Sequence, residues 1–287
     1  MIHHVHDTLE FRRAQDTAAT GDSICLHQGV YTDPIDSYLT KFQGGIGWHT
    51  HPKIFAYQRR GYPVDKVVIR PTSCDFAVRL AHEGMSNIEL IDLVIDAEMV
   101  KIDAVKLTGS TGSAPVHHVT LKRCEITNAP HQGVLITDAH HIRIRECKIH
   151  HNGESHFDHG VYISGNDVTV EDCSLWQNAT YDIHAYDGTG AMKASNLKVI
   201  ENRCRDSGIS GQSGSGILLG GGNDQEALRN YCSGNHFGIQ VYGDARDWRV
   251  DWNTLGRNKS TSYYQQRIYV SPDAAAYGTV GPDNWEV

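Results

Sequence analysis

The chain has 287 residues, 39% hydrophobic and 21% charged, which is the composition of a globular protein rather than a disordered one. Its formal net charge of −8 argues against a nucleic-acid partner, which would need a basic face, and weakens without excluding a polyanionic substrate. No run of about 20 apolar residues is present, so we expect no membrane span. The first residues, Met1 to His4, lack the basic and apolar regions of a signal peptide.

Residues 7–20 have the pattern of a short helix. Asp7 to Glu10 resembles a capping box, in which side chains satisfy the first free N–H groups of a helix. The apolar stripe that follows consists of Leu9, Phe11, Ala14 and Ala18. Residues 33–62 break the repeat described next, so we predict an insertion there. This segment contains His49 and His51, beside Trp48, with the His-x-His spacing of a zinc site. The sequence offers no third zinc ligand that can be named.

An internal repeat is the main signal. Six segments beginning at residues 117, 140, 166, 195, 223 and 246 align, and successive starts differ by 23 to 29 residues, the size of one solenoid coil. The third, fifth, eighth and tenth positions of each segment are predicted to point inward, because apolar residues alternate there as in a half-buried strand. The eighth position holds Cys124, Cys147, Cys173, Asn202, Asn230 and Asn253.

These cysteines are expected to be reduced and buried, since seven cysteines without a Cys-x-x-Cys pair suggest no full disulfide framework. The asparagines that follow are expected to form an internal amide ladder. A further asparagine lies five residues later and is interpreted as a left-handed turn position. It occurs as Asn152, Asn178, Asn235 and Asn258. The pairs His117–His118 and His140–His141 are predicted to stack as a solvent-facing ladder.

A second short strand in each coil has inward second and fourth residues and an outward third residue. The predicted exposed ladder is Lys106, Leu135, Tyr162, His184, Leu218, Gln240 and Tyr269. Stacked coils would place neighbours in this ladder about 4.8 Å apart.

With these features the sequence resembles the pectate-lyase-like superfamily of right-handed parallel β-helix proteins. The resemblance rests on Gly21–Ile24, Gly29–Tyr31, His159–Gly165 and the Cys and Asn ladders, and covers about residues 7–270. It implies an all-β fold, a single-stranded right-handed parallel β-helix with an N-terminal capping helix. We predict one domain over 1–287, with the helix at 7–20, an insertion at 33–62, coils over about 65–270 and an irregular tail at 271–287. The resemblance also implies a secreted or periplasmic location.

Long predicted loops converge around the coils of Tyr162, His184 and Leu218, and insertions in a solenoid usually decorate its binding face. We expect His184 to act as a base, because its ordinary pKa is about 6.5, and Tyr162 on the adjacent coil to act as an acid. The full candidate catalytic set is His184, Tyr162, His159, Asp158 and Asp182, with Asp182 on the outward face beside His184.

Candidate substrate-binding residues would neutralise a uronate carboxylate or stack on sugar rings. They are Lys106, Tyr186, Lys193, Arg267, His156 and Tyr269. The sequence requires no cofactor, but four acids offer the oxygen ligands that calcium prefers. This candidate calcium set is Glu154, Asp158, Asp182 and Asp187.

Three functions remain open, because the superfamily includes lyases, epimerases, glycosidases, phage tailspikes and proteins without known activity. The leading prediction is a polysaccharide lyase, or the related epimerase, acting on a uronic-acid polymer by β-elimination. The alternatives are a glycoside hydrolase with Asp158 and Asp182 as paired carboxylates, and a non-catalytic polysaccharide-binding solenoid. The predicted partner is a polysaccharide or oligosaccharide in each case.

Overall fold

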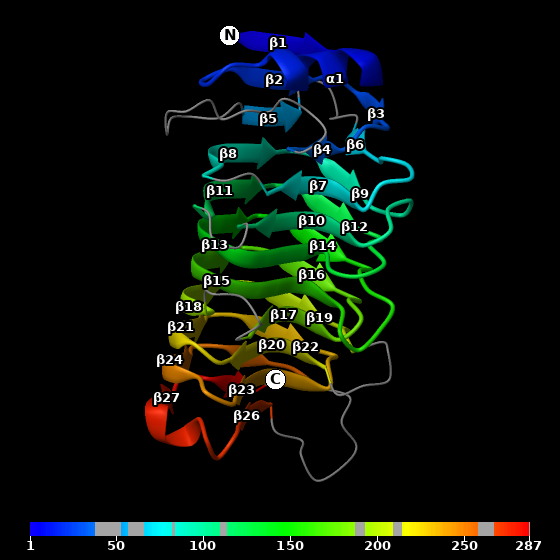
Figure 1. The fold of residues 1–287 in the computed structure, drawn as a ribbon. Coiled ribbons are helices and arrows are strands. Elements are labelled where there is room, and N and C mark those ends of the chain that lie inside the picture. Colours follow the sequence, from blue (N-terminus) through cyan, green and yellow to red (C-terminus); the bar gives the residue numbers. More distant parts are fainter. Residues whose placement is uncertain are drawn as a thin grey trace.

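The structure is a computed structural model that describes residues 1–37, 53–56, 66–81, 84–109, 114–186, 193–208, 214–257 and 267–286. Trp48, His49, His51, Asp187 and Asn258 lie outside these ranges. The chain winds into a solenoid whose strands stack along one axis from the N-terminus to the C-terminal end (Figure 1). All strand pairings between described residues are parallel. The predicted parallel β-helix is therefore confirmed.

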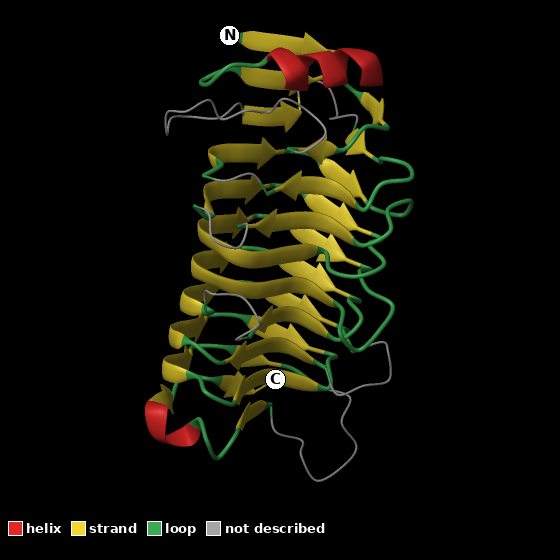
Figure 2. Ribbon diagram, in the orientation of Figure 1, coloured by secondary structure: helices red, strands yellow, loops and turns green. Residues whose placement is uncertain are grey.

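Each coil contributes to three faces of the solenoid, which Figure 2 shows as stacked rows of strands. The first face carries the predicted exposed ladder. It consists of β4 (Ile35–Asp36), β7 (Phe76–Leu80), β10 (Asp103–Thr108), the first halves of β13 (Val134–Arg145) and β15 (His159–Glu171), β17 (Tyr181–Ala185), β20 (Ser215–Gly220), β23 (Phe237–Tyr242) and β26 (Ile268–Val270).

The second face joins the first through β13 and β15, which run round the corner without a break. It consists of β1 (Ile2–Val5), β2 (Ser23–Leu26), β5 (Lys53–Ala56), β8 (Ser86–Ile91), β11 (Val116–Lys122), the second halves of β13 and β15, β18 (Ser195–Ile200), β21 (Asn223–Leu228), β24 (Arg246–Asp251) and β27 (Gly278–Val280).

The third face is a separate sheet. It consists of β3 (Gly29–Tyr31), β6 (Val67–Ile69), β9 (Val94–Asp96), β12 (Glu125–Thr127), β14 (Lys148–His150), β16 (Ser174–Trp176), β19 (Arg203–Arg205), β22 (Tyr231–Ser233), β25 (Thr254–Leu255) and β28 (Trp285–Glu286).

Single residues in the left-handed region turn the chain where the second face meets the third. The seventh position of the repeat has φ between 51° and 60° in every coil from Arg123 to Trp252. The second position has φ between 50° and 57°, and there the sequence supplies His, Asp or Asn, which tolerate this conformation better than most residues. The predicted stacking of the histidine pairs is present here. The ring centroids of His117 and His140 are 5.0 Å apart, and those of His118 and His141 are 4.5 Å apart.

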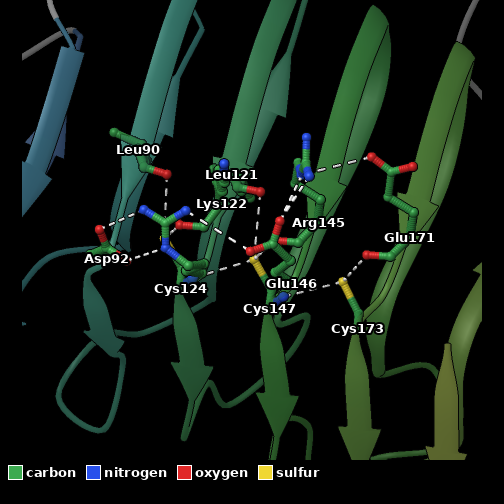
Figure 3. Close-up of polar contacts among 11 residues, drawn as sticks. Leu90, Asp92, Leu121, Lys122, Cys124, Arg145, Glu146, Cys147, Glu171 and Cys173 are labelled. Carbon is green, nitrogen blue, oxygen red and sulfur yellow. Dashed lines mark hydrogen bonds and ion pairs between the residues drawn. The ribbon is translucent and has the colours of Figure 1, made fainter. Parts of the chain in front are cut away.

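The predicted interior ladder is present. The amide of Cys124 donates to the sulfur of Cys147, and Cys147 donates to Cys173, both at 3.4 Å (Figure 3). The ladder continues when Cys173 donates to Asn202 Oδ1 at 3.0 Å, and Asn202 to Asn230. All seven cysteines are free thiols. Each coil is thus bonded to the next along the core by one side chain per turn.

The interpretation of the later asparagines as turn residues is wrong. Asn152 and Asn178 are fully buried, and Asn152 Nδ2 donates to Asn178 Oδ1 at 3.1 Å, so they form a second interior ladder. The left-handed residue is the one before, His151 or Gln177. An amide facing the core needs partners, and the next coil supplies them.

The N-terminal end is closed by α1 (Thr8–Thr17), which packs against β1, β2 and β3. Asp7 caps it by accepting a hydrogen bond from the Glu10 N–H at 2.8 Å, and Phe11 is buried. Leu9 is 54% exposed and does not belong to the buried stripe. Strand β1, which precedes the helix and pairs with β2, was not predicted.

Three predicted boundaries also change. The helix ends at Thr17 rather than at 20. Strands β4 and β5 lie within 33–62 and pair with neighbouring coils, so this segment is not wholly an insertion. Strands β27 and β28, with the 3₁₀ helix η1 (Ala275–Tyr277), add a further turn to the solenoid within the tail. No helix among the described ranges is long and apolar enough to span a membrane.

Candidate functional site

The exposed ladder of the first face has the predicted register. Lys106 pairs with Leu135, Leu135 with Tyr162, and Tyr162 with His184. The ladder continues from His184 through Leu218 and Gln240 to Tyr269. Tyr162 and His184 are therefore direct neighbours on the outer surface of adjacent strands, as their position in the repeat predicts.

His184 lies at the centre of a ring cluster. The centroid of its ring is 4.3 Å from that of His159, 5.2 Å from Tyr162, 4.7 Å from Tyr181 and 5.6 Å from Tyr186. We call these five residues the His–Tyr cluster. Tyr181 was missed in the sequence, although it precedes His184 by three residues just as His159 precedes Tyr162. The pairing of His159 with Tyr181 forms a second outward row beside the ladder.

Both histidines of the cluster are neutral. Burial lowers the pKa of His184 to about 3 and that of His159 well below its ordinary value, with the charge of His184 a second cause for His159. The Nδ1 atoms of both rings are buried and have no hydrogen-bond partner among the described residues. Buried polar atoms are normally paired, so these two nitrogens are an unusual feature of the cluster.

The loop before β15 is held by Asp158, which is 2% exposed. Its carboxylate accepts hydrogen bonds from the backbone amides of Glu154 and Ser155, and from His131 at 2.9 Å. Asp158 therefore shapes the loop that leads into His159, a role that sequence reasoning did not assign to it.

Gln132, also missed, connects this loop to the preceding coil. Its Oε1 accepts a hydrogen bond from the backbone N–H of His159 at 2.8 Å, and its Nε2 donates to the Phe157 carbonyl at 2.9 Å. The Gln132 N–H in turn donates to Asp103 at 2.9 Å. Burial raises the pKa of Asp103 to about 6, while Lys106 and His131 oppose the shift. Gln132 and Asp103 precede Leu135 and Lys106 by three residues, so the spacing that reveals Tyr181 also finds them.

Asp182 does not share the outward face of His184, and this prediction is wrong. Its side chain is fully buried inside the coil, where Oδ1 accepts from Asn178 Nδ2 at 2.7 Å and from the Ser207 hydroxyl at 2.6 Å. Neighbouring coils have glycine at this position, and a Cβ on Gly160 would meet Asn178 Nδ2 at 2.8 Å. The position therefore faces the asparagine ladder rather than the groove.

The candidate substrate-binding residues divide into near and distant groups. Tyr186 belongs to the cluster, and Lys106 is two strands from Tyr162, about 10 Å along the ladder. Tyr269 is three strands from His184, about 14 Å, and Arg267 is on the same coil. His156 is exposed and packs against Phe157, with 3.8 Å between the ring centroids. Lys193 precedes β18 on the second face.

The three proposed calcium ligands that the structure describes are not brought together. Glu154 is exposed on the loop, Asp158 is engaged by backbone amides, and Asp182 is inside the solenoid. Within the part of the chain that the structure describes, no group of three His, Cys, Asp or Glu side chains is arranged to hold a metal ion. These residues do not fit the expected site.

A cleft of about 510 Å³ lies on another part of the surface, where the second face meets the third. Its charged side chains pair across coils: Arg123 bonds to Asp92 at 2.6 Å, and Lys66 to Glu125 at 2.8 Å. Figure 3 shows the adjoining contacts, in which Arg145 and Glu146 meet beside the cysteine ladder. Because these charges compensate one another between coils, we interpret the cleft as part of the scaffold.

These observations define a parallel β-solenoid with a cluster of neutral histidines and tyrosines on one face. The sequence profile of the right-handed β-helix region matches residues 103–208 and 159–271, together more than half of the chain. The chain belongs to this family. No curated protein sequence matches it.

Several solved structures share the fold. An alginate lyase from Paenibacillus sp. str. FPU-7 aligns with a TM-score of 0.75 and 15% identity, over 99% of this chain and 95% of that one. The A-module of a mannuronan C-5 epimerase from Azotobacter vinelandii aligns with a TM-score of 0.62 and 16% identity, over 98% and 88%. A lacto-N-biosidase from Eubacterium ramulus aligns with a TM-score of 0.65 and 11% identity, over 99% and 67%. At these identities the likeness is one of fold.

Proposed function

We propose that this protein is a polysaccharide lyase that cleaves a uronic-acid polymer by β-elimination. The observation that carries the proposal is the pair formed by neutral His184 and Tyr162, whose ring centroids lie 5.2 Å apart on adjacent strands of the first face. The solved structures with similar folds include an alginate lyase and a mannuronan C-5 epimerase, which supports this substrate class.

The proposed reaction needs a base and an acid. Neutral His184 removes the proton at C5 of the uronate, and the electron pair of that bond forms the C4–C5 double bond. The C4–O bond breaks, and the Tyr162 hydroxyl gives its proton to the leaving oxygen. A low pKa makes free His184 a weak base. A bound uronate carboxylate would raise that pKa, because a nearby negative charge stabilises the imidazolium.

Charge neutralisation is assigned to Lys106. Its ammonium lies 4.9 Å from the centroid of the Phe76 ring. It is also close enough to Asp103 to oppose the rise in the pKa of that carboxyl. At about 10 Å from Tyr162 along the ladder, Lys106 would bind the carboxylate of a neighbouring sugar rather than that of the reacting one. Substrate would then lie along the solenoid axis, across successive strands.

The test is an assay of the purified chain on alginate, polygalacturonate and a neutral glucan. A lyase releases oligosaccharides with an unsaturated, ultraviolet-absorbing end, and does so only from the uronans. Reducing ends without this absorbance would contradict the proposal. An epimerase would leave chain length unchanged and exchange the C5 proton with solvent, which NMR in D₂O detects.

Glycoside hydrolysis is the second candidate. The expected partner carboxylates, Asp158 and Asp182, do not face one groove, since Asp182 is internal. Asp103 offers a different pairing with Asp158, because its pKa is raised to about 6 and Asp158 contributes to that rise. A carboxyl whose pKa is raised in this way can serve as a general acid. Loss of hydrolysis in Asp103→Asn, with His184→Ala active, would favour this function.

A further inference from the structure

Large exposed aromatic side chains lie in and beside the His–Tyr cluster. Phe157 is 71% exposed on the loop before β15, while Tyr186 is 46% and Tyr242 54% exposed, at the carboxyl ends of β17 and β23. Aromatic surface therefore lies on both long sides of the exposed ladder. Exposed apolar groups beside a polar site are typical of ligand-binding surfaces.

The two tyrosines lie at the same level of the first face, on either side of one strand. Tyr186 follows β17 directly, and its N–H donates to the Ile163 carbonyl at 3.0 Å. In the next strand Leu219 pairs with Ala185, so Gly220 is the residue beside Tyr186. Gly220 pairs in turn with Tyr242. The backbones of the two tyrosines are thus two strand spacings apart, about 10 Å.

Gly220 keeps the intervening strand free of a side chain. A Cβ at Gly220 would lie 2.8 Å from Leu218 Cδ2 and 3.5 Å from Tyr186 Cδ2. Glycine therefore allows the Tyr186 ring and the Leu218 side chain to lie close together over β20. Leu218 is only 6% exposed and forms the floor between the tyrosines.

Tyr242 is near enough to Tyr181 for the two phenols to influence each other electrostatically. Burial is the main cause that raises the pKa of Tyr181, and the charge of Tyr242 is the second. The Tyr186 ring is 5.6 Å from that of His184. The Tyr186 ring therefore packs within the cluster, and Tyr242 lies near it.

We propose that Tyr186 and Tyr242 form a subsite that stacks on a pyranose ring of the polysaccharide, next to the sugar held at His184 and toward the C-terminal end of the solenoid. This inference rests on the proposed function and names a subsite of the same groove. An aromatic face binds the C–H side of a sugar ring. The subsite recognises a ring rather than a charge, so neutral and acidic sugars both fit.

The test compares Tyr242→Ala with Tyr277→Ala, which removes a tyrosine of similar exposure, 45%, at the end of the solenoid. Steady-state kinetics on alginate or polygalacturonate, whichever the wild type cleaves, should show KM at least about fivefold higher for Tyr242→Ala and kcat nearly unchanged, since a remote stacking contact binds ground and transition states alike. Tyr242→Phe should keep the wild-type KM, because the ring is retained.

Retardation in gels containing the same polysaccharide gives a readout independent of turnover. Tyr242→Ala should migrate faster than wild type, and Tyr277→Ala should not. Equal KM and equal retardation for the two alanine variants would overturn the subsite while leaving the lyase proposal intact. If Tyr242→Phe loses as much as Tyr242→Ala, the hydroxyl binds rather than the ring, and the stacking inference is wrong. A wild type that neither cleaves nor binds any uronan would instead remove the proposed function.

Discussion

Asn178 donates its amide hydrogen to Asp182 at 2.7 Å inside the solenoid, at the point where the asparagine ladder is interrupted by Ser207. In the coil before, Asn152 donates in the same way to Asn178 Oδ1. Asp182 Oδ1 thus takes the place of the amide oxygen that a serine at 207 cannot supply. The aspartate that replaces glycine and the serine that replaces asparagine complement each other, which gives Asp182 a role in the core.

This arrangement predicts how pH affects stability. Burial raises the pKa of Asp182 to about 7 in the folded protein, so the folded state binds the proton more tightly than the unfolded chain. Its contribution to stability is complete below the unfolded pKa, about 3.8, and is lost as pH rises through about 7. Asp182→Asn removes this loss. Relative to wild type, its free energy of unfolding should increase between pH 4 and 7, by about 1.4 kcal/mol per pH unit and about 4 kcal/mol in all.

Urea denaturation at several pH values measures this difference directly. The control is Asp244→Asn, because the Asp244 side chain is 79% exposed and its substitution should add no pH dependence. A pH-independent difference between Asp182→Asn and wild type would show that the Asp182 carboxyl is not held neutral.

The error over Asp182 illustrates what the repeat could predict. Alternation in the second strand placed Tyr162 and His184 correctly, because each inward Val or Ile fixes the direction of its neighbour. Asp182 and the next residue, Ile183, are both buried, so alternation does not hold at the start of this strand. Gly133 and Gly160 at the same register were the available signal, since close approach of an interior amide is what excludes a side chain there.

The lowered pKa values of the two histidines in the cluster could not be predicted from the sequence. The repeat predicted which residues share a face, but the loss of solvent around His159 and His184 depends on how five rings pack, and this determines their pKa values. The bonds of Gln132 to the loop before β15 are likewise contacts between coils, 25 and 27 residues apart in sequence. Such contacts depend on side-chain lengths and loop geometry that periodicity does not encode.

Gln132 should act as a positioning residue for His159. In Gln132→Ala the His159 N–H and the Phe157 carbonyl both lose their partner, so the loop should become mobile. We expect kcat/KM on the cleaved uronan to fall about tenfold, on the scale of a misplaced contact, with little change in the midpoint of thermal unfolding. Gln132→Glu keeps the acceptor for His159 and should recover part of the activity. Hydrogen exchange of residues 153–158 reports the loop directly. Unchanged exchange would argue against this role.

The N-terminal end should be required for solubility. Deleting residues 1–20 removes β1 and α1, which leaves β2 as an open strand edge and uncovers the interior residues Ile24 and Leu26. Exposed parallel edges pair with other chains, so the truncated protein should aggregate. Light scattering on refolding tests this, and a monomeric truncation with the wild-type unfolding midpoint would contradict it. The substitution Phe11→Ala distinguishes the contribution of the helix from that of the strand, because it loosens α1 while β1 stays paired with β2.

The assignment of His184 as base can be tested through pH and substitution together. Because its pKa in the free protein is about 3, His184 is already neutral at pH 5, so kcat/KM, which reports the free enzyme, should show no loss from His184 between pH 7 and pH 5.

His184→Ala should lower kcat at least about 10²-fold with the fold intact, the scale of losing a general base. Tyr162→Phe should have a comparable effect, since it removes the proton donor and keeps the ring. His151→Ala is the matched control, because His151 is exposed and directly follows β14 on the third face, away from the cluster. Near-native turnover in both His184→Ala and Tyr162→Phe would place the chemistry elsewhere on the first face, with Asp103 and Asp158 the next residues to substitute.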